Sequence, residues 1–333
     1  MAGKTIIVTG ATRGLGKLVA MGAAAMGERV ILTYRDEARG KAALADVAAA
    51  SANAAIAAKA ADKASAHAAA IQGHAAGKKA ASEAAEAAPS TEAAPLIAAG
   101  PRPELLRLDL ASLASVRAAA AEARERFPRV DVLVNNAGTF SRNYAETAEG
   151  VELTMCTNYL GPFLFTRLLL PNMDTGSRIV NLTSAVFTMG NVRLGKPAGS
   201  GPWGGFMNYA ASKRALLLFS LDLAETLRPR GISVNALHPG VVRTEIMRMR
   251  TWYGPIVDLI LAPFYGPPDA GVDAAIRLAL SPELEGATGG YYDRNRLAAV
   301  PARFLDPAVA EELLRESLRL VGESPRTEPP ARA

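Results

Sequence analysis

The sequence has little of what several protein classes need. It contains one cysteine, Cys156, which excludes an internal disulfide, and three histidines, which form no metal-ligand cluster of recognisable spacing. No run reaches the ~18 uninterrupted apolar residues of a membrane helix, and the first residues lack the pattern of a signal peptide. We therefore expect a cytoplasmic protein in a reducing compartment, with no metal and no integral membrane segment.

Charge gives no sign of a nucleic-acid partner. The formal net charge is +5, but basic residues are interspersed with acidic ones, as in residues 122–126, and no basic run or aromatic-basic stripe occurs. With 333 residues, 50% of them hydrophobic, the chain is long enough to bury one large core. This composition is compatible with a homo-oligomer but does not fix the oligomeric state.

Short β-rich runs alternate with longer helical stretches, the arrangement of a parallel sheet covered by helices on both faces. We expect strands over residues 6–9, 30–33, 105–108, 130–135, 178–182 and 233–237. We expect helices over residues 16–26, 113–127, 151–170, 209–227 and 269–280. The sequence thus predicts one α/β domain over residues 1–322, a Rossmann-type doubly wound parallel sheet, followed by a disordered tail over 323–333.

One segment, residues 41–100, is dominated by alanine. Alanine favours helix but buries little apolar area, and a Rossmann unit needs only one helix between its second and third strands. We therefore expect an exposed Ala-rich insertion that is helical or disordered. In the alternative, it is a helical hairpin that binds a partner.

A glycine-rich loop follows the first expected strand. Its glycines permit a tight turn and close approach of the backbone to a phosphate, and the helix that follows points its unpaired N–H groups toward that phosphate. The position between a strand and a helix favours a dinucleotide site over an ordinary turn. The loop residues expected to bind the cofactor are Gly10, Thr12, Arg13, Gly14, Leu15 and Gly16.

The end of the second strand carries Tyr34 and Arg35, where an NAD-binding protein would place an acid on the ribose 2′-hydroxyl. Arg35 and Arg13 suit the 2′-phosphate of NADP, because a guanidinium can hold a phosphate through paired hydrogen bonds. The sequence therefore favours NADP (NADPH) over NAD. In the alternative, Asp36 binds the ribose and Arg35 is a solvated surface charge.

Further cofactor contacts are expected where later strands end, because ligands bind at the carboxyl edge of an open parallel sheet. The residues after the third strand are placed near the adenine, and the turn over residues 239–244 can close over the nicotinamide. These predicted contacts are Asp109, Leu110, Asn136, Ala137, Gly138, Pro239, Gly240, Val242 and Thr244.

Four residues are candidates for the chemistry. Tyr209 and Lys213 lie four apart in an expected helix and share a face, so the ammonium can lower the tyrosine pKa of ~10 and make the phenol a proton donor for hydride transfer. Lys213 would also bind the nicotinamide ribose. Ser184, at a strand end, can polarise a substrate oxygen. Asn158 is an amide inside an expected helix, where amides are mildly unfavourable without a role.

The order of these motifs resembles that of the short-chain dehydrogenase/reductase family over residues 4–245, apart from the alanine-rich segment. The resemblance implies an NADP-dependent oxidoreductase in which Tyr209 is the general acid/base and Lys213 lowers its pKa. It also implies that Ser184 orients the substrate and that Asn158 supports a water linking Lys213 to bulk solvent.

Residues 30–36 and 289–314 resemble the retinol dehydrogenase-like branch of that family, which tends to use NADP and apolar alcohols or carbonyls. An apolar stretch over residues 245–268 is expected to form a lid over the substrate, with a loop over 195–206 on the other side. A small apolar alcohol, aldehyde or ketone is the expected substrate. In the alternative, the stretch packs into the core or forms a dimer contact.

Two other functions are open. A ketoacyl-type reductase would need a basic docking patch for an acyl carrier near the lid, where Arg248 and Arg250 are the only hints. A non-catalytic module that senses NADP would be expected to lack Tyr209 or Lys213, and both residues are present.

Overall fold

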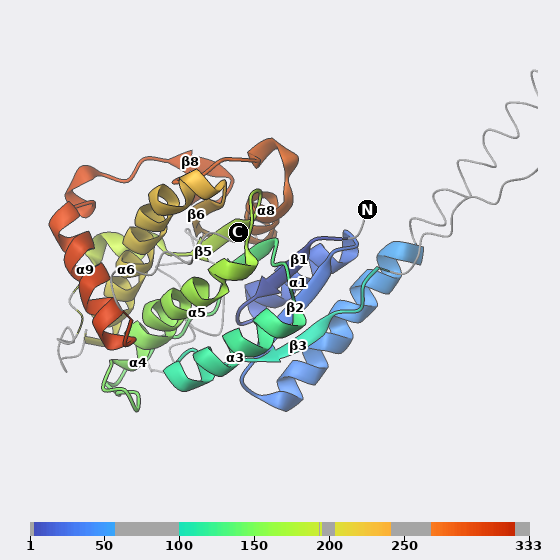
Figure 1. Cartoon of the computed structure of the whole chain (residues 1–333), viewed down its shortest axis with the longest axis horizontal. Coiled ribbons are helices and arrows are strands. Elements are labelled where there is room, and N and C mark those ends of the chain that lie inside the picture. Colours follow the sequence, from blue (N-terminus) through green and yellow to red (C-terminus); the bar gives the residue numbers. More distant parts are fainter. Residues whose placement is uncertain (1–2, 57–99, 193, 195–203, 241–267, 324–333) are drawn as a thin grey trace, which may run out of the picture.

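A computed structural model describes residues 3–56, 100–192, 194, 204–240 and 268–323. An eight-stranded sheet lies at its centre in the order β3-β2-β1-β4-β5-β6-β7-β8 (Figure 1). The strands are β1 (Thr5–Val8), β2 (Arg29–Tyr34), β3 (Glu104–Arg107), β4 (Val132–Asn135), β5 (Arg178–Leu182), β6 (Ser233–His238), β7 (Tyr291–Asp293) and β8 (Arg296–Ala298). Strands β1 to β7 pair in parallel and β8 pairs antiparallel to β7.

Helices cover both faces of the sheet (Figure 1). The labelled helices are α1 (Gly14–Ala25), α3 (Leu113–Arg126), α4 (Leu153–Met155), α5 (Gly161–Leu169), α6 (Gly204–Leu227), α8 (Pro268–Leu280) and α9 (Pro307–Leu320). Residues 37–56 are also helical. One core cluster joins α3, α5, α6 and α9 to the sheet, and a second joins α1, α8 and the helix over 37–56 to the opposite face.

The strands lack polar alternation because both of their faces are buried. Ile7 of β1 contributes to the first cluster, whereas its neighbours Ile6 and Val8 contribute to the second. A side chain that points to either face therefore enters apolar core, as expected for a parallel sheet between two helical layers. The predicted Rossmann-type fold is confirmed, with strand and helix ends shifted by a few residues.

The structure differs from the sequence prediction in two places. The single helix expected over residues 151–170 is divided into α4, a π-helical turn at Cys156–Leu160, and α5, followed by a 3-10 turn at Leu170–Asn172. The closing part of the chain adds β7, β8 and α9, none of which was predicted. Helix α9 packs against α6, among the helices that the first core cluster joins to the sheet (Figure 1).

Parts of the predicted insertion and tail lie outside the described residues. Residues 41–56 belong to a helix whose first turns pack Ala43 and Val47 into the core, whereas 57–99 and 324–333 are not described. Within the described ranges, no helix combines the length and apolarity needed to span a bilayer. The assignment of residues 1–322 to one domain stays a prediction.

Candidate active site

The glycine loop lies between β1 and α1, at the carboxyl edge of the sheet. Gly10 has a φ of +65°, and a Cβ on it would lie 2.8 Å from Ala137 Cα, so only glycine fits. A Cβ on Gly14 would meet no atom within 4 Å, which leaves open space beside the first turn of α1. The N-cap residue of this helix is Arg13, whose side chain carries only donors and makes no cap hydrogen bond to the first N–H groups of α1. The loop therefore fits a pyrophosphate.

Two strand ends are locked together behind this loop. The Thr9 hydroxyl accepts hydrogen bonds from the backbone N–H groups of Asn136 and Ala137, each at 3.0 Å. The Asn136 amide returns a hydrogen bond to Thr9 O at 2.8 Å. A Cβ on Gly16 would overlap the same amide, so α1 begins in direct contact with the end of β4. The structure thus brings the predicted residues of β1, α1 and β4 together.

The end of β2 separates the two predicted ribose candidates. Asp36 Oδ1 accepts a hydrogen bond from Arg39 N at 2.9 Å, so this carboxylate caps the helix that begins at residue 37. Arg35 is exposed at the carboxyl end of β2, beside the loop that carries the exposed Arg13. The cap assigns a structural role to Asp36, whereas Arg35 is exposed at the same strand end.

The turn after β3 carries the two residues expected to lie near the adenine. Asp109 Oδ1 accepts a hydrogen bond from Ala111 N at 3.0 Å, which closes a tight turn before α3. Leu110 is buried, and its carbonyl lies against Gly161, where a Cβ would overlap it. Both predicted residues therefore lie at the carboxyl edge, and the turn that carries them contacts the start of α5.

Tyr209 and Lys213 lie on one face of α6, as predicted from their spacing. Lys213 Nζ lies 5.7 Å from the centre of the Tyr209 ring and donates a hydrogen bond to Leu182 O at 2.8 Å. Ser184, just after β5, is hydrogen-bonded to the Tyr209 hydroxyl. Three of the four predicted catalytic residues thus form one contiguous group.

The electrostatics of this group differ from the sequence expectation. Burial raises the pKa of the Tyr209 phenol, and the hydrogen bond from Ser184 lowers it only in part. Burial also lowers the pKa of Lys213 to about 8. The Tyr209 pKa in the protein alone is therefore shifted upward, opposite to the lowering by Lys213 expected from the sequence.

Asn158, the fourth predicted residue, lies within the π-helical turn and is fully buried. Its Oδ1 accepts a hydrogen bond from Thr139 N at 2.7 Å, and its Nδ2 donates to Thr139 O at 2.9 Å and to Ser212 Oγ at 3.0 Å. A Cβ on Gly138 would lie 3.6 Å from both Asn158 Oδ1 and Lys213 Nζ. Asn158 and Lys213 therefore border the same space beside Gly138.

Sequence reasoning missed two residues of the site. Phe140 packs edge-on against the Tyr209 ring, with ring centres 5.9 Å apart. His238, at the end of β6, is buried, and its Nδ1 has no hydrogen-bond partner among the described residues. A lone aromatic and a histidine before Pro239 carry no spacing signal of their own, so neither could be identified from the sequence.

The turn predicted to close over the nicotinamide is described only in part. Its first residues, Pro239 and Gly240, lie at the sheet edge, and Gly240 has a φ of +87°. Val242, Thr244, the expected lid as far as residue 267, and residues 195–203 of the expected loop lie outside the described residues. The rest of that loop prediction, residues 204–206, is wrong, because these residues form the first turn of α6. Arg248 and Arg250, the basic residues on which the ketoacyl-type alternative rests, also lie outside the described residues.

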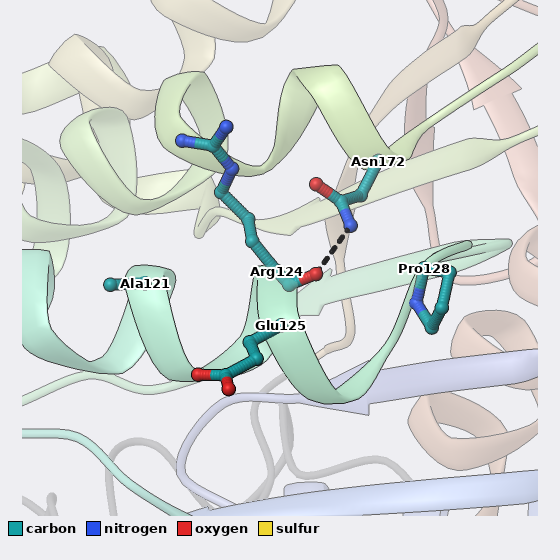
Figure 2. Close-up of a pocket in the computed structure, with 5 residues that line it drawn as sticks. All are labelled: Ala121, Arg124, Glu125, Pro128 and Asn172. Carbon is teal, nitrogen blue, oxygen red and sulfur yellow. Dashed lines mark hydrogen bonds between the residues drawn. The ribbon is translucent and has the colours of Figure 1, made fainter.

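A separate hollow of about 470 Å³ lies at the opposite edge of the sheet (Figure 2). It is lined by Ala121, Arg124, Glu125, Pro128 and Asn172. The Asn172 amide donates hydrogen bonds to Arg124 O at 3.1 Å and to Phe127 O at 2.8 Å. The hollow follows the carboxyl end of α3, where the amino ends of the strands lie, and none of the predicted site residues that the structure describes lines it. The candidate active site is therefore the group of side chains at the carboxyl edge, and not this hollow.

Comparison with known proteins agrees with this geometry. The family model for short chain dehydrogenase matches residues 4–81 and 66–252. Human retinol dehydrogenase 14 is 32% identical, covering 97% of this chain and 87% of that protein. Mouse polyprenol dehydrogenase is also 32% identical, covering 96% of this chain and 84% of that protein.

Solved structures share the fold. A short chain dehydrogenase from Burkholderia cenocepacia in complex with NADP is 26% identical, with a TM-score of 0.61, covering 88% of this chain and 96% of that one. A blue fluorescent protein from a metagenomic library in complex with NADPH is 26% identical, with a TM-score of 0.60 and the same coverage.

The buried ammonium of Lys213 predicts a pH dependence of stability. Its pKa is lowered from 10.5 to about 8, so the unfolded chain binds more protons than the folded chain between these pH values. The contribution of Lys213 to stability should therefore rise with pH in this window, by up to about 3 kcal/mol over its full width. The buried Cys156 thiol, whose pKa is raised from 9.0 to about 12, contributes the opposite slope above its ordinary pKa. The test is therefore a difference: in urea unfolding at several pH values between 8 and 10, the slope should be more positive in the wild type than in Lys213→Met.

The matched control is Lys41→Met, because Lys41 is an exposed lysine paired with Glu37. This variant should retain the wild-type slope. An unchanged slope in Lys213→Met would show that Lys213 is fully charged in the folded protein throughout this window.

Proposed function

This chain belongs to the short-chain dehydrogenase family, in the retinol dehydrogenase-like branch, and from that premise we propose that it interconverts an apolar alcohol and its carbonyl compound with NADP(H). The family and its relatives identify an oxidoreductase that acts on alcohols or carbonyls. The observation that carries the proposal is the contiguous group of Ser184, Tyr209 and Lys213 beside the glycine loop.

Proton transfer is assigned to Tyr209. Its raised pKa keeps the phenol protonated at neutral pH, so its hydroxyl can donate a proton to the oxygen of a carbonyl under reduction. Ser184 contacts this hydroxyl, and its own hydroxyl can hydrogen-bond the same substrate oxygen and stabilise the charge that develops there. NADPH, when bound, supplies the hydride, and NADP accepts it in the reverse direction.

Lys213 and Asn158 act around this tyrosine. The Lys213 ammonium lies on the Tyr209 ring, where it favours the phenolate once the proton has left. It can also bind the hydroxyls of the nicotinamide ribose. Asn158 borders the same space as Lys213, beside Gly138, and we propose that it supports a water through which the proton is replaced.

The choice of NADP rests on the end of β2. Asp36 is already engaged as a helix cap, whereas Arg35 is exposed where the ribose of a bound dinucleotide would lie. A guanidinium there favours a 2′-phosphate. The related structures that contain NADP or NADPH support this choice.

An apolar substrate is supported by the names of the relatives, which designate retinol and polyprenol as the alcohols of those proteins. Phe140 adds an aromatic ring beside that of Tyr209 in this chain.

We propose a cytoplasmic location, because the one cysteine is a buried free thiol and no disulfide is formed.

Tyr209→Phe should abolish most turnover while leaving NADPH affinity within a few-fold of the wild type. Loss of a general acid costs about 10²- to 10⁴-fold in rate, and the ring itself is retained. NADPH oxidation should be followed with a panel of apolar aldehydes and ketones. The control is Tyr144→Phe, which removes the hydroxyl of an exposed tyrosine in the loop after β4. Wild-type turnover in Tyr209→Phe would refute the proton-transfer assignment.

Arg35→Ala should weaken NADP binding by about tenfold or more and change NAD binding little, because a hydrogen bond to a charged group contributes about 1.5–3 kcal/mol. Calorimetric titration with both dinucleotides measures this ratio. Asp36→Asn serves as the control, since asparagine also caps helices and should leave the ratio unchanged. Tighter binding of NAD than of NADP by the wild type would overturn the choice of cofactor.

A further inference from the structure

The backbone that presents Asn158 is an unusual turn. Residues Cys156–Leu160 form a π-helical turn, closed by a hydrogen bond from Gly161 N to Cys156 O. Such turns hold one residue more than an α-helical turn, are rare, and persist where the surroundings fix them. Helix α4, which precedes the π-helical turn, is only three residues long and cannot fix the turn by itself. The contacts made by the side chains of the turn must therefore fix it.

Two neighbouring residues of the turn contact α6 at different points. Asn158 reaches Thr139 and, on α6, Ser212 beside the catalytic group. Tyr159 contacts α6 two turns farther along, with its ring centre 6.3 Å from that of Phe219, and lies 5.9 Å from that of Phe163. A turn that lost its extra residue would rotate the side chains on one side of it by about 100° relative to the other. The contacts of Asn158 and Tyr159 could then not both survive.

The hydroxyl of Tyr159 is bound by the carboxyl-terminal helix. Tyr159 Oη lies 2.6 Å from Ser317 Oγ of α9, and Ser317 Oγ donates to Leu313 O at 2.6 Å. A serine hydroxyl has one hydrogen, so Tyr159 is the donor and Ser317 the acceptor. The two residues are 1% and 0% exposed, so water cannot replace either partner. Burial also raises the pKa of the Tyr159 phenol, which keeps the donor protonated.

We propose that Tyr159 and Ser317 are a positioning pair, through which α9 holds the π-helical turn in register and keeps the Asn158 amide beside Lys213. This inference rests on the proposed function, because the place of Asn158 matters to turnover only if it serves Tyr209 and Lys213. Among the described residues, the contacts of the pair outside itself are with Phe163, Phe219 and Leu313, none of them a predicted site residue, so we infer that the pair acts through Asn158.

Three variants separate positioning from stability. Tyr159→Phe keeps the ring and removes the hydrogen-bond donor of the pair, so no buried donor is left unsatisfied and the melting temperature should change little. Because the turn is then no longer held by α9, kcat should fall about tenfold, or ~1.4 kcal/mol. Ser317→Ala leaves the buried Tyr159 hydroxyl without its acceptor, so both the melting temperature and kcat should fall. The double variant removes the stranded hydroxyl and should regain the melting temperature without regaining kcat. The KM for NADPH should stay unchanged in all three.

A readout independent of turnover follows the turn itself. Hydrogen exchange of a peptide over residues 152–165 should be faster in Tyr159→Phe than in the wild type, because the π-helical turn is less firmly held. The control is Glu323→Gln, which removes the ion pair with Arg167 (3.1 Å) that also ties the end of α9 to α5. This variant should keep wild-type kcat and wild-type exchange over 152–165.

The outcomes distinguish this inference from the proposed function. Wild-type kcat and wild-type exchange in Tyr159→Phe would overturn the positioning pair, and so would a kcat that follows the melting temperature across all variants. If the wild type turned over no alcohol or carbonyl compound in the panel, the proposed function would fail. Hydrogen exchange would then still decide whether the pair holds the turn.

Discussion

The parallel alignment of β1 to β7 is the constraint on which the site depends. Parallel strands bring their carboxyl ends to one edge, and burial on both faces leaves that edge as the place for polar side chains. Strand order reverses between β1 and β4, where the glycine loop and the end of β4 are joined by Thr9 and Asn136. Two later strands add polar groups to the same edge, Ser184 after β5 and His238 at the end of β6.

Burial sets the chemistry of this edge as much as charge does. The pKa of Tyr209 is raised and that of Lys213 is lowered by the same desolvation, so both shifts favour neutral side chains. A tyrosine that holds its proton is suited to protonate a carbonyl oxygen. The reverse direction requires the phenolate, which the adjacent ammonium and the hydrogen bond with Ser184 both favour.

The sequence predicted the sheet and the main site residues because their signals are local. A β-rich run followed by glycines marks β1 and its loop, and a spacing of four places Tyr209 and Lys213 on one face of α6. Features that depend on distant partners could not be predicted. The apolar pattern of residues 151–170 is the same with or without a π-helical turn, and the contact of Tyr159 with Ser317 joins residues 158 positions apart. Strands β7 and β8 have three residues each, too few for a clear period. The cap formed by Asp36 is different, because it could have been predicted: an aspartate directly before a helix is a recognisable cap.

The Tyr159 hydroxyl is not explained by stability. A phenylalanine would pack against Phe163 and Phe219 equally well and would need no acceptor, and replacing both members of a buried hydrogen-bonded pair by apolar groups can be nearly neutral for stability. What an apolar ring lacks is direction, because many orientations of a ring on a ring have similar energy. A donor with one buried acceptor accepts a single arrangement. Since Asn158 is the preceding residue of the same turn, the arrangement that satisfies Tyr159 is also the one that places an amide in the space shared with Lys213.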